Sequence, residues 1–275
     1  MPYVPRAMSQ EILSRRPRRR THDAPLLFVH GAFLGAWCWD EHFLSHFASL
    51  GYDAHAVSLR GHGASPLDGP LDVVGLDDYV ADVLLAARQL GASPVLIGHS
   101  MGAIVVQRAA RRCDARAMVL IAPVPPRGLG GSLMSLATRD LPLFLALNAF
   151  QAGGNRDAPA LGRIRNYLFS DSLTQSAVRR YLERMQRESQ RALMDLMWPQ
   201  HLWIRDARGL PTLVMGAGAD ALCSSPMIEE AARFHDVLPT IFEGMAHAMM
   251  LDPNWPEVAQ HLGAWLDELK PTARG

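Results

Sequence analysis

The sequence contains little cysteine, and this scarcity limits the classes of protein that it can represent. Three cysteines occur in 275 residues, Cys38, Cys113 and Cys223, and no two of them have the Cys-x-x-Cys spacing. Their number and spacing exclude a disulfide framework and a cysteine-rich zinc site. Free thiols far apart in a chain are typical of proteins from reducing compartments, so we expect a cytoplasmic protein.

The sequence also lacks an excess of charge and a long apolar run. Its 27 basic and 27 acidic side chains give a net charge near zero, which provides no long-range attraction to nucleic acid or to anionic lipid. No run of about 18 apolar residues is present, so we expect no membrane-spanning helix. With 49% hydrophobic and 20% charged residues, the chain is too apolar to be disordered.

The first 24 residues carry a basic cluster and no apolar stretch. Five arginines lie between residues 15 and 20, and no aromatic side chain is interleaved with them. We interpret residues 1–24 as a solvated tail or as first strands. Contact with nucleic acid or a membrane surface is the alternative. Because the segment has no apolar core, we expect no secretory signal.

Segments with strand and helix patterns alternate along most of the chain. This alternation predicts an α/β fold with a mostly parallel, doubly wound sheet and helices on both faces. Gly91 is expected to end one helix in the left-handed conformation. The expected strands are 25–30, 53–58, 94–99, 115–122, 211–216 and 240–242, and the expected helices are 39–50, 76–90, 101–112, 226–235 and 254–270.

One long stretch interrupts the alternation. Between residues 129 and 208 helical patterns dominate, prolines and glycines separate them, and no strong strand pattern occurs. A stretch without strands inside an α/β alternation predicts an inserted helical cap at 129–208. The segments 25–128 and 209–275 then form the core of the fold.

The sequence Gly98-His99-Ser100-Met101-Gly102 matches the pattern Gly-x-Ser-x-Gly. Such a string also occurs by chance, so its context decides its meaning. Here a buried strand is predicted to end at the motif, and a helix is predicted to follow at once. That turn strains the backbone of the serine, and the two glycines let strand and helix approach closely. Ser100 is therefore the candidate nucleophile.

A serine hydroxyl needs a base to remove its proton. In this strand-turn-helix layout the acid and then the histidine follow the serine along the chain. Four histidines lie downstream, His201, His235, His247 and His261. The first lies in the predicted cap, and His235 and His261 lie on predicted surface helices. His247 follows the last predicted strand, at the sheet edge where sites of such folds assemble, so we predict His247 as the base.

Asp220 is the predicted partner of that histidine. It follows the predicted strand 211–216 through a short glycine-containing turn, and its expected role is to bind the imidazole Nδ1–H. The turn faintly resembles a dinucleotide glycine loop, but no acidic ribose partner follows a second strand, so we expect no cofactor. Competing carboxylates lie mostly on helices or near caps, where a charge usually faces solvent: Glu229, Glu230, Asp236, Glu243 and Asp252.

Two backbone N–H groups are expected to bind a developing oxyanion. Met101, directly after the nucleophile, supplies one of them. The second comes from the loop after the first core strand, where Ala32 is the first choice and Phe33 the alternative. Phe33 is also a candidate contact for substrate. His30, at the start of this loop, is expected to fix it by hydrogen bonds and not to react.

Two further histidines, His42 and His46, lie four residues apart on one predicted helix. Side chains at this spacing share a helix face and could bind a metal ion together. No third ligand follows at a suitable spacing, so we expect surface imidazoles and no metal.

Taken together, these motifs resemble the α/β-hydrolase superfamily. The matching pieces follow the superfamily's order: HGAF (30–33), RGHGAS (60–65), GHSMG (98–102), the turn that ends at Asp220, and GMAHAMMLD (244–252). The resemblance implies an α/β-hydrolase fold, a Ser-His-Asp triad and no cofactor. It departs from epoxide hydrolases and haloalkane dehalogenases, which have aspartate in place of Ser100. The stretch HGAFLGAWCW (30–39) is similar to plant methylesterases and hydroxynitrile lyases, and the rest to bacterial esterases and monoacylglycerol lipases.

The sequence therefore predicts a carboxylic ester hydrolase that acts through Ser100, His247 and Asp220. Because the predicted cap is rich in Leu, Met and Trp, the expected substrate is a small ester with an apolar acyl or aryl group. The same three residues could instead serve carbon–carbon bond cleavage, thioester cleavage or perhydrolysis. Cyanohydrin lysis is disfavoured, because plant lyases of this kind use a lysine close to the histidine and the only lysine here is Lys270. A ligand-binding receptor on a hydrolase scaffold is the remaining alternative.

Overall fold

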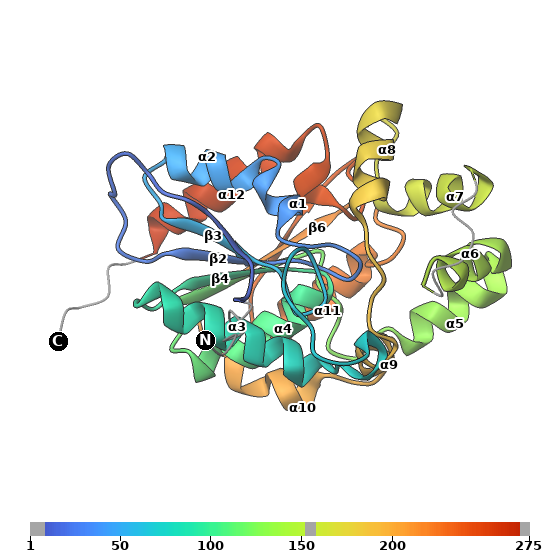
Figure 1. The fold of residues 1–275 in the computed structure, drawn as a ribbon, viewed down its shortest axis with the longest axis horizontal. Coiled ribbons are helices and arrows are strands. Elements are labelled where there is room, and N and C mark those ends of the chain that lie inside the picture. Colours follow the sequence, from blue (N-terminus) through green and yellow to red (C-terminus); the bar gives the residue numbers. More distant parts are fainter. Residues whose placement is uncertain (1–8, 152–157, 270–275) are drawn as a thin grey trace, which may run out of the picture.

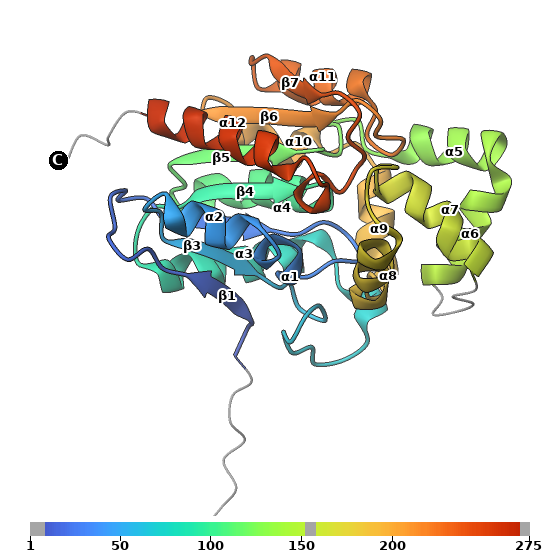
Figure 2. The same ribbon diagram turned by 90° about the horizontal axis from the view of Figure 1, so that it is seen from above.

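One sheet forms the centre of the computed structural model, which describes residues 9–151 and 158–269. Within these ranges seven strands lie in the order β1-β3-β2-β4-β5-β6-β7. All neighbours pair in parallel except β1, which pairs antiparallel with β3. The predicted α/β fold with a mostly parallel sheet is thus confirmed (Figures 1 and 2). Residues 1–8 of the predicted tail, 152–157 of the predicted cap and Lys270 lie outside the described ranges.

The central strands are covered on both faces. Every residue of β2 to β6 is buried, as expected for parallel strands between two layers of helices. In β2, Leu26 and Phe28 belong to one hydrophobic cluster, whereas Leu27 and Val29 belong to the other. The strands are β1 (Ile12–Arg15), β2 (Leu26–Val29), β3 (Ala54–Val57), β4 (Val95–His99), β5 (Ala117–Ile121), β6 (Thr212–Ala217) and β7 (Pro239–Phe242).

Helices cover both faces of the sheet (Figure 2). One face carries α1 (Trp37–Asp40), α2 (Phe43–Ser49) and α12 (Trp255–Glu268), and the other carries α3 (Leu76–Leu90), α4 (Met101–Ala109) and α11 (Ser225–Phe234). Short 3-10 turns lie at Leu71–Val73, Ala110–Arg112, Arg205–Ala207 and Met249–Leu251. α3 has the predicted bounds, and Gly91 ends it in the left-handed conformation with φ 66°. In the described ranges no helix is long and apolar enough to cross a membrane.

The prediction of one helix over 39–50 is wrong. The chain instead forms α1 and α2, which are separated at His42, a residue with φ −140° and ψ −52°. The ring of His42 stacks on Trp255 of α12 with 4.8 Å between ring centroids, and His46 lies edge-on to the same side chain at 5.5 Å. The break thus lies at a residue whose ring docks on α12. Neither histidine takes part in a group of possible metal ligands among the described residues.

Between β5 and β6 the described residues form helices and no strand, as predicted. α5 to α8 lie beyond the carboxyl ends of the strands, whereas α10 packs against α4 (Figures 1 and 2). We call residues 129–208 the helical insertion; its status as a separate cap domain stays a prediction. Its helices are α5 (Gly130–Arg139), α6 (Leu141–Gln151), α7 (Ala158–Leu168), α8 (Gln175–Arg184), α9 (Gln190–Met197) and α10 (His201–Ile204).

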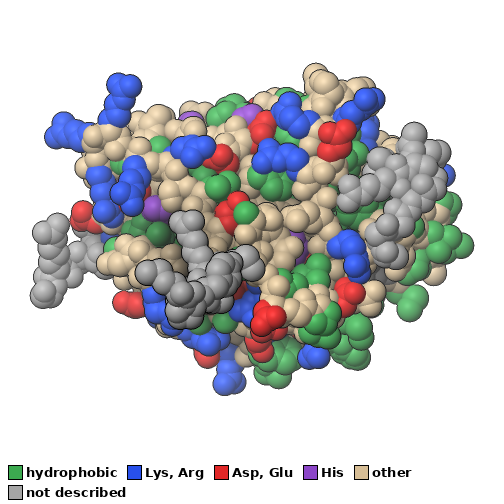
Figure 3. Space-filling model, in the orientation of Figure 1, with side chains coloured by type: hydrophobic (Ala, Val, Ile, Leu, Met, Phe, Trp, Pro, Cys, Tyr) green, Lys and Arg blue, Asp and Glu red, His purple; other side chains and the backbone are tan. Residues whose placement is uncertain are grey.

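The helical insertion presents apolar side chains at the surface. Figure 3 shows such side chains over α9 and α10, at the lower right of the view. A cluster of exposed apolar side chains is unusual on a protein surface and is typical of regions that bind apolar molecules. The large exposed hydrophobic residues of the insertion are Met134, Leu141, Leu145, Met194, Met197, Trp198, Leu202 and Trp203.

The N-terminal segment is anchored at the edge of the sheet. Its strand β1 pairs with β3, and Glu11 contacts the loop that follows β3. The Glu11 carboxylate accepts hydrogen bonds from the Ser58 hydroxyl at 2.5 Å and from the Ala64 N–H at 3.1 Å. The Glu11 N–H donates to the Ser65 hydroxyl at 2.9 Å. The stretch predicted as tail or first strands therefore contains a strand.

The basic cluster at 15–20 ends β1 and continues into a loop. Arg15 forms an ion pair with Asp40 at 2.8 Å. Arg20 donates hydrogen bonds to the carbonyl groups of His22 and Asp23. Both arginines thus contact groups of the same chain.

Candidate active site

Ser100 lies at a sharp turn between β4 and α4. Its φ of 53° and ψ of −116° lie in a region that residues other than glycine rarely adopt. A Cβ on Gly98 would lie 2.4 Å from the carbonyl oxygen of Gly102, and a Cβ on Gly102 would lie 2.5 Å from that of His30. Both positions therefore need glycine, and the turn has the strained geometry that the motif predicts. We call residues 98–102 the elbow.

Asp220 and His247 form a buried, hydrogen-bonded pair. His247 Nδ1 lies 2.7 Å from Asp220 Oδ2. The other carboxylate oxygen, Oδ1, accepts the backbone N–H groups of Leu222 at 2.8 Å and Cys223 at 2.9 Å, which fixes its orientation. When Nδ1–H is donated to Asp220, Nε2 of His247 carries the lone pair that can accept a proton.

His99 brings the loop of His247 next to the elbow. Its Nε2–H donates to the carbonyl oxygen of His247 at 2.9 Å, and the two rings lie 4.7 Å apart. Burial, together with the nearby His247, holds the pKa of His99 well below its usual range, so its ring is neutral. Among the described residues, neither the Ser100 hydroxyl nor His247 Nε2 forms a hydrogen bond, so the contact between these two groups stays a prediction.

The loop after β2, residues 30–34, lies directly against the elbow. A Cβ on Gly31 would lie 3.1 Å from the Cβ of Ser100. His30 fixes this loop, as predicted: its Nδ1–H donates to the Gly31 carbonyl at 2.8 Å, and its Nε2 accepts the Leu59 N–H at 3.0 Å. Burial lowers the pKa of His30 to about 3, so the ring holds the loop as a neutral group.

Unpaired backbone amides lie on both sides of Ser100. Within the described ranges, the N–H groups of Ala32, Phe33 and Met101 donate to no acceptor. Met101 is the first residue of α4, where the helix dipole favours negative charge. The Phe33 backbone has a φ of 66°, and its ring lies 5.6 Å, edge to face, from Phe150 of α6. Both alternatives for the second oxyanion donor, Ala32 and Phe33, are therefore available.

Cys223 lies beside the Asp220–His247 pair. One possible ligand atom from each of these three side chains lies within 4.8 Å of the others, the one such group of possible metal ligands in the described ranges. Burial, with the nearby Asp220, raises the pKa of the Cys223 thiol well above its usual range. Both oxygens of Asp220 are already hydrogen-bonded. A metal ion would have to displace those bonds, so the group suits an acid–base pair better than a metal centre.

The competing residues from the sequence lie elsewhere or have other partners. Of the described carboxylates, Asp220 alone is hydrogen-bonded to the ring of His247. His235 contacts Gln107 at 2.7 Å, and His261 contacts Thr240 at 3.0 Å. Other partners hold three of the competing carboxylates: Glu230 pairs with Arg127, Asp236 pairs with Arg208, and Asp252 accepts the Asn254 N–H.

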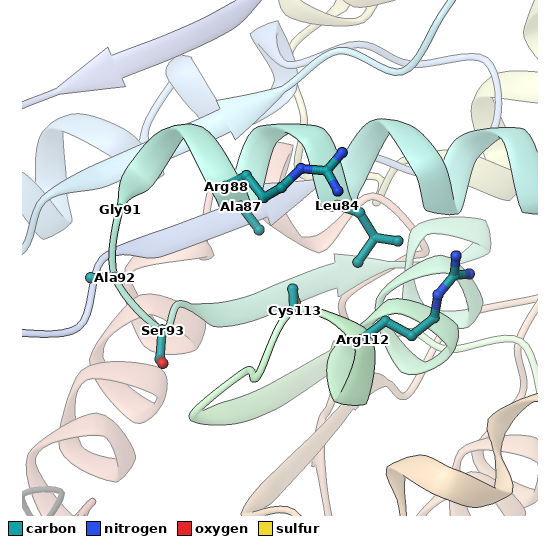
Figure 4. Close-up of a pocket in the computed structure, with 8 residues that line it drawn as sticks. All are labelled: Leu84, Ala87, Arg88, Gly91, Ala92, Ser93, Arg112 and Cys113. Carbon is teal, nitrogen blue, oxygen red and sulfur yellow. The ribbon is translucent and has the colours of Figure 1, made fainter. Parts of the chain in front are cut away.

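A hollow of about 260 Å³ lies at the opposite end of the sheet (Figure 4). The end of α3, the turn that leads into β4 and the residues after α4 line it. Ser100 follows the carboxyl end of β4, whereas the hollow lies at its amino end, so the hollow is not part of the site. Its lining residues are Leu84, Ala87, Arg88, Gly91, Ala92, Ser93, Arg112 and Cys113.

Sequence reasoning missed two side chains of the helical insertion that reach the site loops. Gln186 contacts the loops after β2 and β3, and Glu188 pairs with His62. Both lie between α8 and α9, where the sequence shows neither apolar periodicity nor a motif. No sequence signal marks them.

Comparison with known families and curated proteins gives a consistent result. A model described as "Alpha/beta hydrolase family" matches residues 26–260. Over 107 residues the chain is 34% identical to "Probable esterase PIR7A" of Oryza sativa subsp. japonica, which covers 37% of this chain and 40% of the relative. Over 78 residues it is 36% identical to "Methylesterase 18" of Arabidopsis thaliana, which covers 28% and 29%. The matched part thus spans less than half the length of these relatives.

Solved structures share the fold at low sequence identity. The structure of Rv0554 from Mycobacterium tuberculosis has a TM-score of 0.75 and 18% identity, and the match covers 95% of this chain and 94% of that chain. A thermophilic esterase from Thermogutta terrifontis has a TM-score of 0.71 and 17% identity, with 95% of each chain covered. At these identities the likeness extends to the fold and no further.

Proposed function

The chain belongs to the alpha/beta hydrolase family, and from this premise we propose that it hydrolyses carboxylic esters with Ser100, His247 and Asp220 as a catalytic triad. One observation carries the proposal. The elbow presents Ser100 in a strained turn beside a loop whose His247 is hydrogen-bonded to the buried Asp220 at 2.7 Å. The named esterase and methylesterase among the relatives support ester chemistry.

In the first half of the reaction Ser100 is acylated. His247 Nε2 takes the proton of the Ser100 hydroxyl while the oxygen attacks the ester carbonyl, and a tetrahedral intermediate forms. Asp220 keeps the imidazole in the required tautomer and stabilises the imidazolium. His247 then gives its proton to the leaving alcohol, the carbon–oxygen bond of the ester breaks, and the acyl group stays on Ser100.

In the second half water releases the acid. His247 removes a proton from the attacking water, a second tetrahedral intermediate forms, and the proton passes to the Ser100 oxygen as the acid leaves. The free N–H groups of Met101 and of Ala32 or Phe33 are suited to bind the oxyanion in both halves. No step needs a metal ion or a cofactor.

The proposed substrate is a small ester with an apolar acyl or aryl group. The Phe33 ring contacts Phe150 of α6 beside the oxyanion loop, which gives that side of the site an apolar wall. Exposed apolar residues on α5 and α6, the helices beyond the carboxyl ends of the strands, support the same preference: Met134, Leu141 and Leu145. The scarcity of cysteine, with Cys38, Cys113 and Cys223 all free, supports a cytoplasmic location.

Turnover of p-nitrophenyl esters of rising acyl length, together with a benzoate ester, tests this proposal. Ser100→Ala is expected to lower kcat by more than about 10³-fold, and a fluorophosphonate probe is expected to label the wild type but not this variant. Ser45→Ala, an exposed serine on α2, is the matched control and should behave as the wild type. Full activity in Ser100→Ala contradicts the triad. Turnover of thioester or diketone substrates without turnover of esters would favour thioester or carbon–carbon bond cleavage. If the probe fails to label Ser100 and a small ligand raises the melting temperature, a ligand-binding receptor is favoured.

A further inference from the structure

Residues 185–189 connect α8 to α9 and pass beside the site loops; we call this segment the strap. Figure 1 shows the yellow-brown connection running from α8 to α9 past the loops that follow β2 and β3. Its end residues have extended backbone, with φ −67° and ψ 142° at Met185 and φ −65° and ψ 129° at Ser189. An extended segment leaves backbone and side-chain polar groups available for contacts with its surroundings.

Gln186 of the strap binds two separate loops of the core. Its backbone N–H donates to the carbonyl oxygen of Phe33 at 2.9 Å. Its side-chain Oε1 accepts the N–H of Gly63 at 2.7 Å. Gln186 thereby ties the loop after β2, which carries the candidate oxyanion donors, to the loop after β3.

The strap is held in place by a buried ion pair. Glu188 Oε2 lies 3.2 Å from His62 Nε2, and both side chains are fully buried. His62 Nδ1 lies 3.2 Å from the Arg60 carbonyl, so one ring nitrogen has a hydrogen-bond acceptor and the other faces the Glu188 carboxylate. Glu188 Oε1 accepts hydrogen bonds from the Tyr79 hydroxyl and from the Ser189 N–H. Separating two buried, opposite charges leaves an uncompensated charge, so this ion pair resists displacement of the strap.

The same ion pair reaches the oxyanion loop from its other side. The ring of His62 lies 5.2 Å from that of His30. His30 in turn holds the Gly31 carbonyl. The loop is thus held at Gly31 through His30, and at Phe33 through Gln186.

Phe33 needs such external contacts, because its own conformation is unfavourable. A phenylalanine with φ 66° lies in the left-handed region, which a residue with a bulky side chain avoids unless its surroundings hold it there. The amide plane between Ala32 and Phe33 carries one of the candidate oxyanion donors. If Phe33 relaxes, that N–H turns away from the oxyanion.

We propose that Gln186 is a positioning residue for the oxyanion loop: the docked strap holds Phe33 in its left-handed conformation and thereby aims the loop amides at the oxyanion beside Ser100. The inference rests on the proposed function. It makes the helical insertion part of the catalytic arrangement. Its effect falls on the transition state, where the oxyanion is formed, and not on substrate binding.

The test compares Gln186→Met with Gln190→Met, a matched control on an exposed glutamine of α9. Gln186→Met removes the side-chain acceptor for the Gly63 N–H, which loosens the strap, and keeps the backbone hydrogen bond to Phe33. With a p-nitrophenyl ester, the variant is expected to lower kcat about fivefold to tenfold, since the one hydrogen bond to Gly63 is lost, and to leave KM within about twofold. A trifluoromethyl ketone forms an oxyanion when it adds to the active serine. Its affinity should fall by the same factor as kcat/KM, whereas Gln190→Met should match the wild type in all three measurements.

Several outcomes would overturn this role. Gln186 has a structural role only if Gln186→Met leaves kcat unchanged or raises KM alone. The same conclusion follows if kcat falls without a matching loss of affinity for the ketone. If Gln186→Met does not fold, Gln186→Ala, which removes the acceptor without a bulky replacement, serves the same comparison. A wild type that neither turns over esters nor binds the ketone contradicts the proposed function itself. A wild type that does both while the Gln186 variants match it contradicts only the role of the strap.

Discussion

The elbow and the loop after β2 lie against each other, yet they hold their strained backbones by different means. Ser100 depends first on a contact close in sequence, because Gly98 at the end of the strand packs against the backbone of Gly102 in the same turn; Gly102 itself packs against the carbonyl groups at the end of β2. Phe33 is held from far along the chain, by Gln186 of the strap. One half of the site is thus determined by a local motif, whereas the other half depends on how the helical insertion docks.

The largest effect is expected from a substitution in the turn that carries Asp220, which, like the elbow, is determined by residues close in sequence. Asp220→Asn keeps an oxygen for the N–H groups of Leu222 and Cys223, so the melting temperature should stay close to that of the wild type. Its amide group cannot accept the Nδ1–H of His247, which favours the wrong tautomer. A fall in kcat of roughly 10⁴-fold is expected. Asp252→Asn, a buried competitor, is the control, and ester turnover is the measurement. An equal fall in kcat in Asp220→Asn and Asp252→Asn would contradict the assignment of Asp220 as the partner of His247.

Gly98→Ala should break the elbow itself. The new Cβ would lie 2.4 Å from the Gly102 carbonyl oxygen, a backbone atom that cannot move away without distorting α4. We expect a loss of more than about 4 kcal/mol in the free energy of unfolding, or no folded protein. Urea denaturation measures the loss. Gly131→Ala, at an exposed helical position with no atom within 4 Å of the new Cβ, should be neutral or slightly stabilising. A stable Gly98→Ala protein would show that the turn is not tightly packed.

Glu188→Gln should separate the two parts of the site, because it weakens the ion pair that holds the strap and leaves the elbow intact. The substitution leaves the buried His62 without its counter-charge, so we expect a loss of about 3 kcal/mol in the free energy of unfolding. Urea denaturation near pH 5.5 measures it. Glu229→Gln, on the surface of α11, should change stability little. A loss confined to Glu229→Gln, or none in either variant, would mean that the ion pair does not hold the strap.

The stabilising effect of that ion pair should depend on pH in a defined direction. Burial alone would lower the pKa of His62 and raise that of Glu188. The attraction between the two charges, together with their hydrogen bonds, outweighs burial: it raises the pKa of His62 above 6.5 and lowers the pKa of Glu188 below 4.5. The stabilisation is therefore complete between about pH 4.5 and 6.5. It declines as the pH rises through the raised pKa of His62, and as the pH falls through the lowered pKa of Glu188.

This pH dependence appears as a difference between two proteins. The difference in unfolding free energy between wild type and Glu188→Gln should shrink as the pH rises above the raised pKa of His62. The expected decrease is about 1 kcal/mol for each further pH unit. The nearby His30 stays neutral, because burial lowers its pKa to about 3, and the nearby Tyr79 stays protonated, because burial and Glu188 raise its pKa. Neither group therefore disturbs the comparison. A gap independent of pH from 5 to 9 would contradict a charged pair.

The sequence was sufficient for the locally determined features. The α/β alternation predicted the sheet, and the bounds of α3 followed from its apolar spacing and Gly91. The elbow around Ser100 follows from two glycines whose missing side chains permit the turn. Asp220 and His247, each placed after a predicted strand, lie in hydrogen-bond contact because parallel strands end at one edge.

What the sequence did not reveal depends on contacts between distant residues. The break between α1 and α2 coincides with the contact of His42 with Trp255, a residue more than 200 positions away that no helical pattern records. The strap has no periodicity, and its function rests on partners in three other segments. The pairing of β1 likewise depends on the neighbouring β3 and not on its own four residues.

The short strand β1 also covers one edge of the sheet, and we expect this cover to limit self-association. It pairs along the whole of β3, whose residues are all buried, and it ends in Ser14 and Arg15, polar residues that discourage a further strand from adding. A truncation that removed residues 9–15 would turn β3 into an open, apolar edge, and open edges of this kind recruit strands from other molecules. It would also free the loop after β3 from Glu11. A purification tag with a cleavage site close to β1 therefore carries a risk of aggregation.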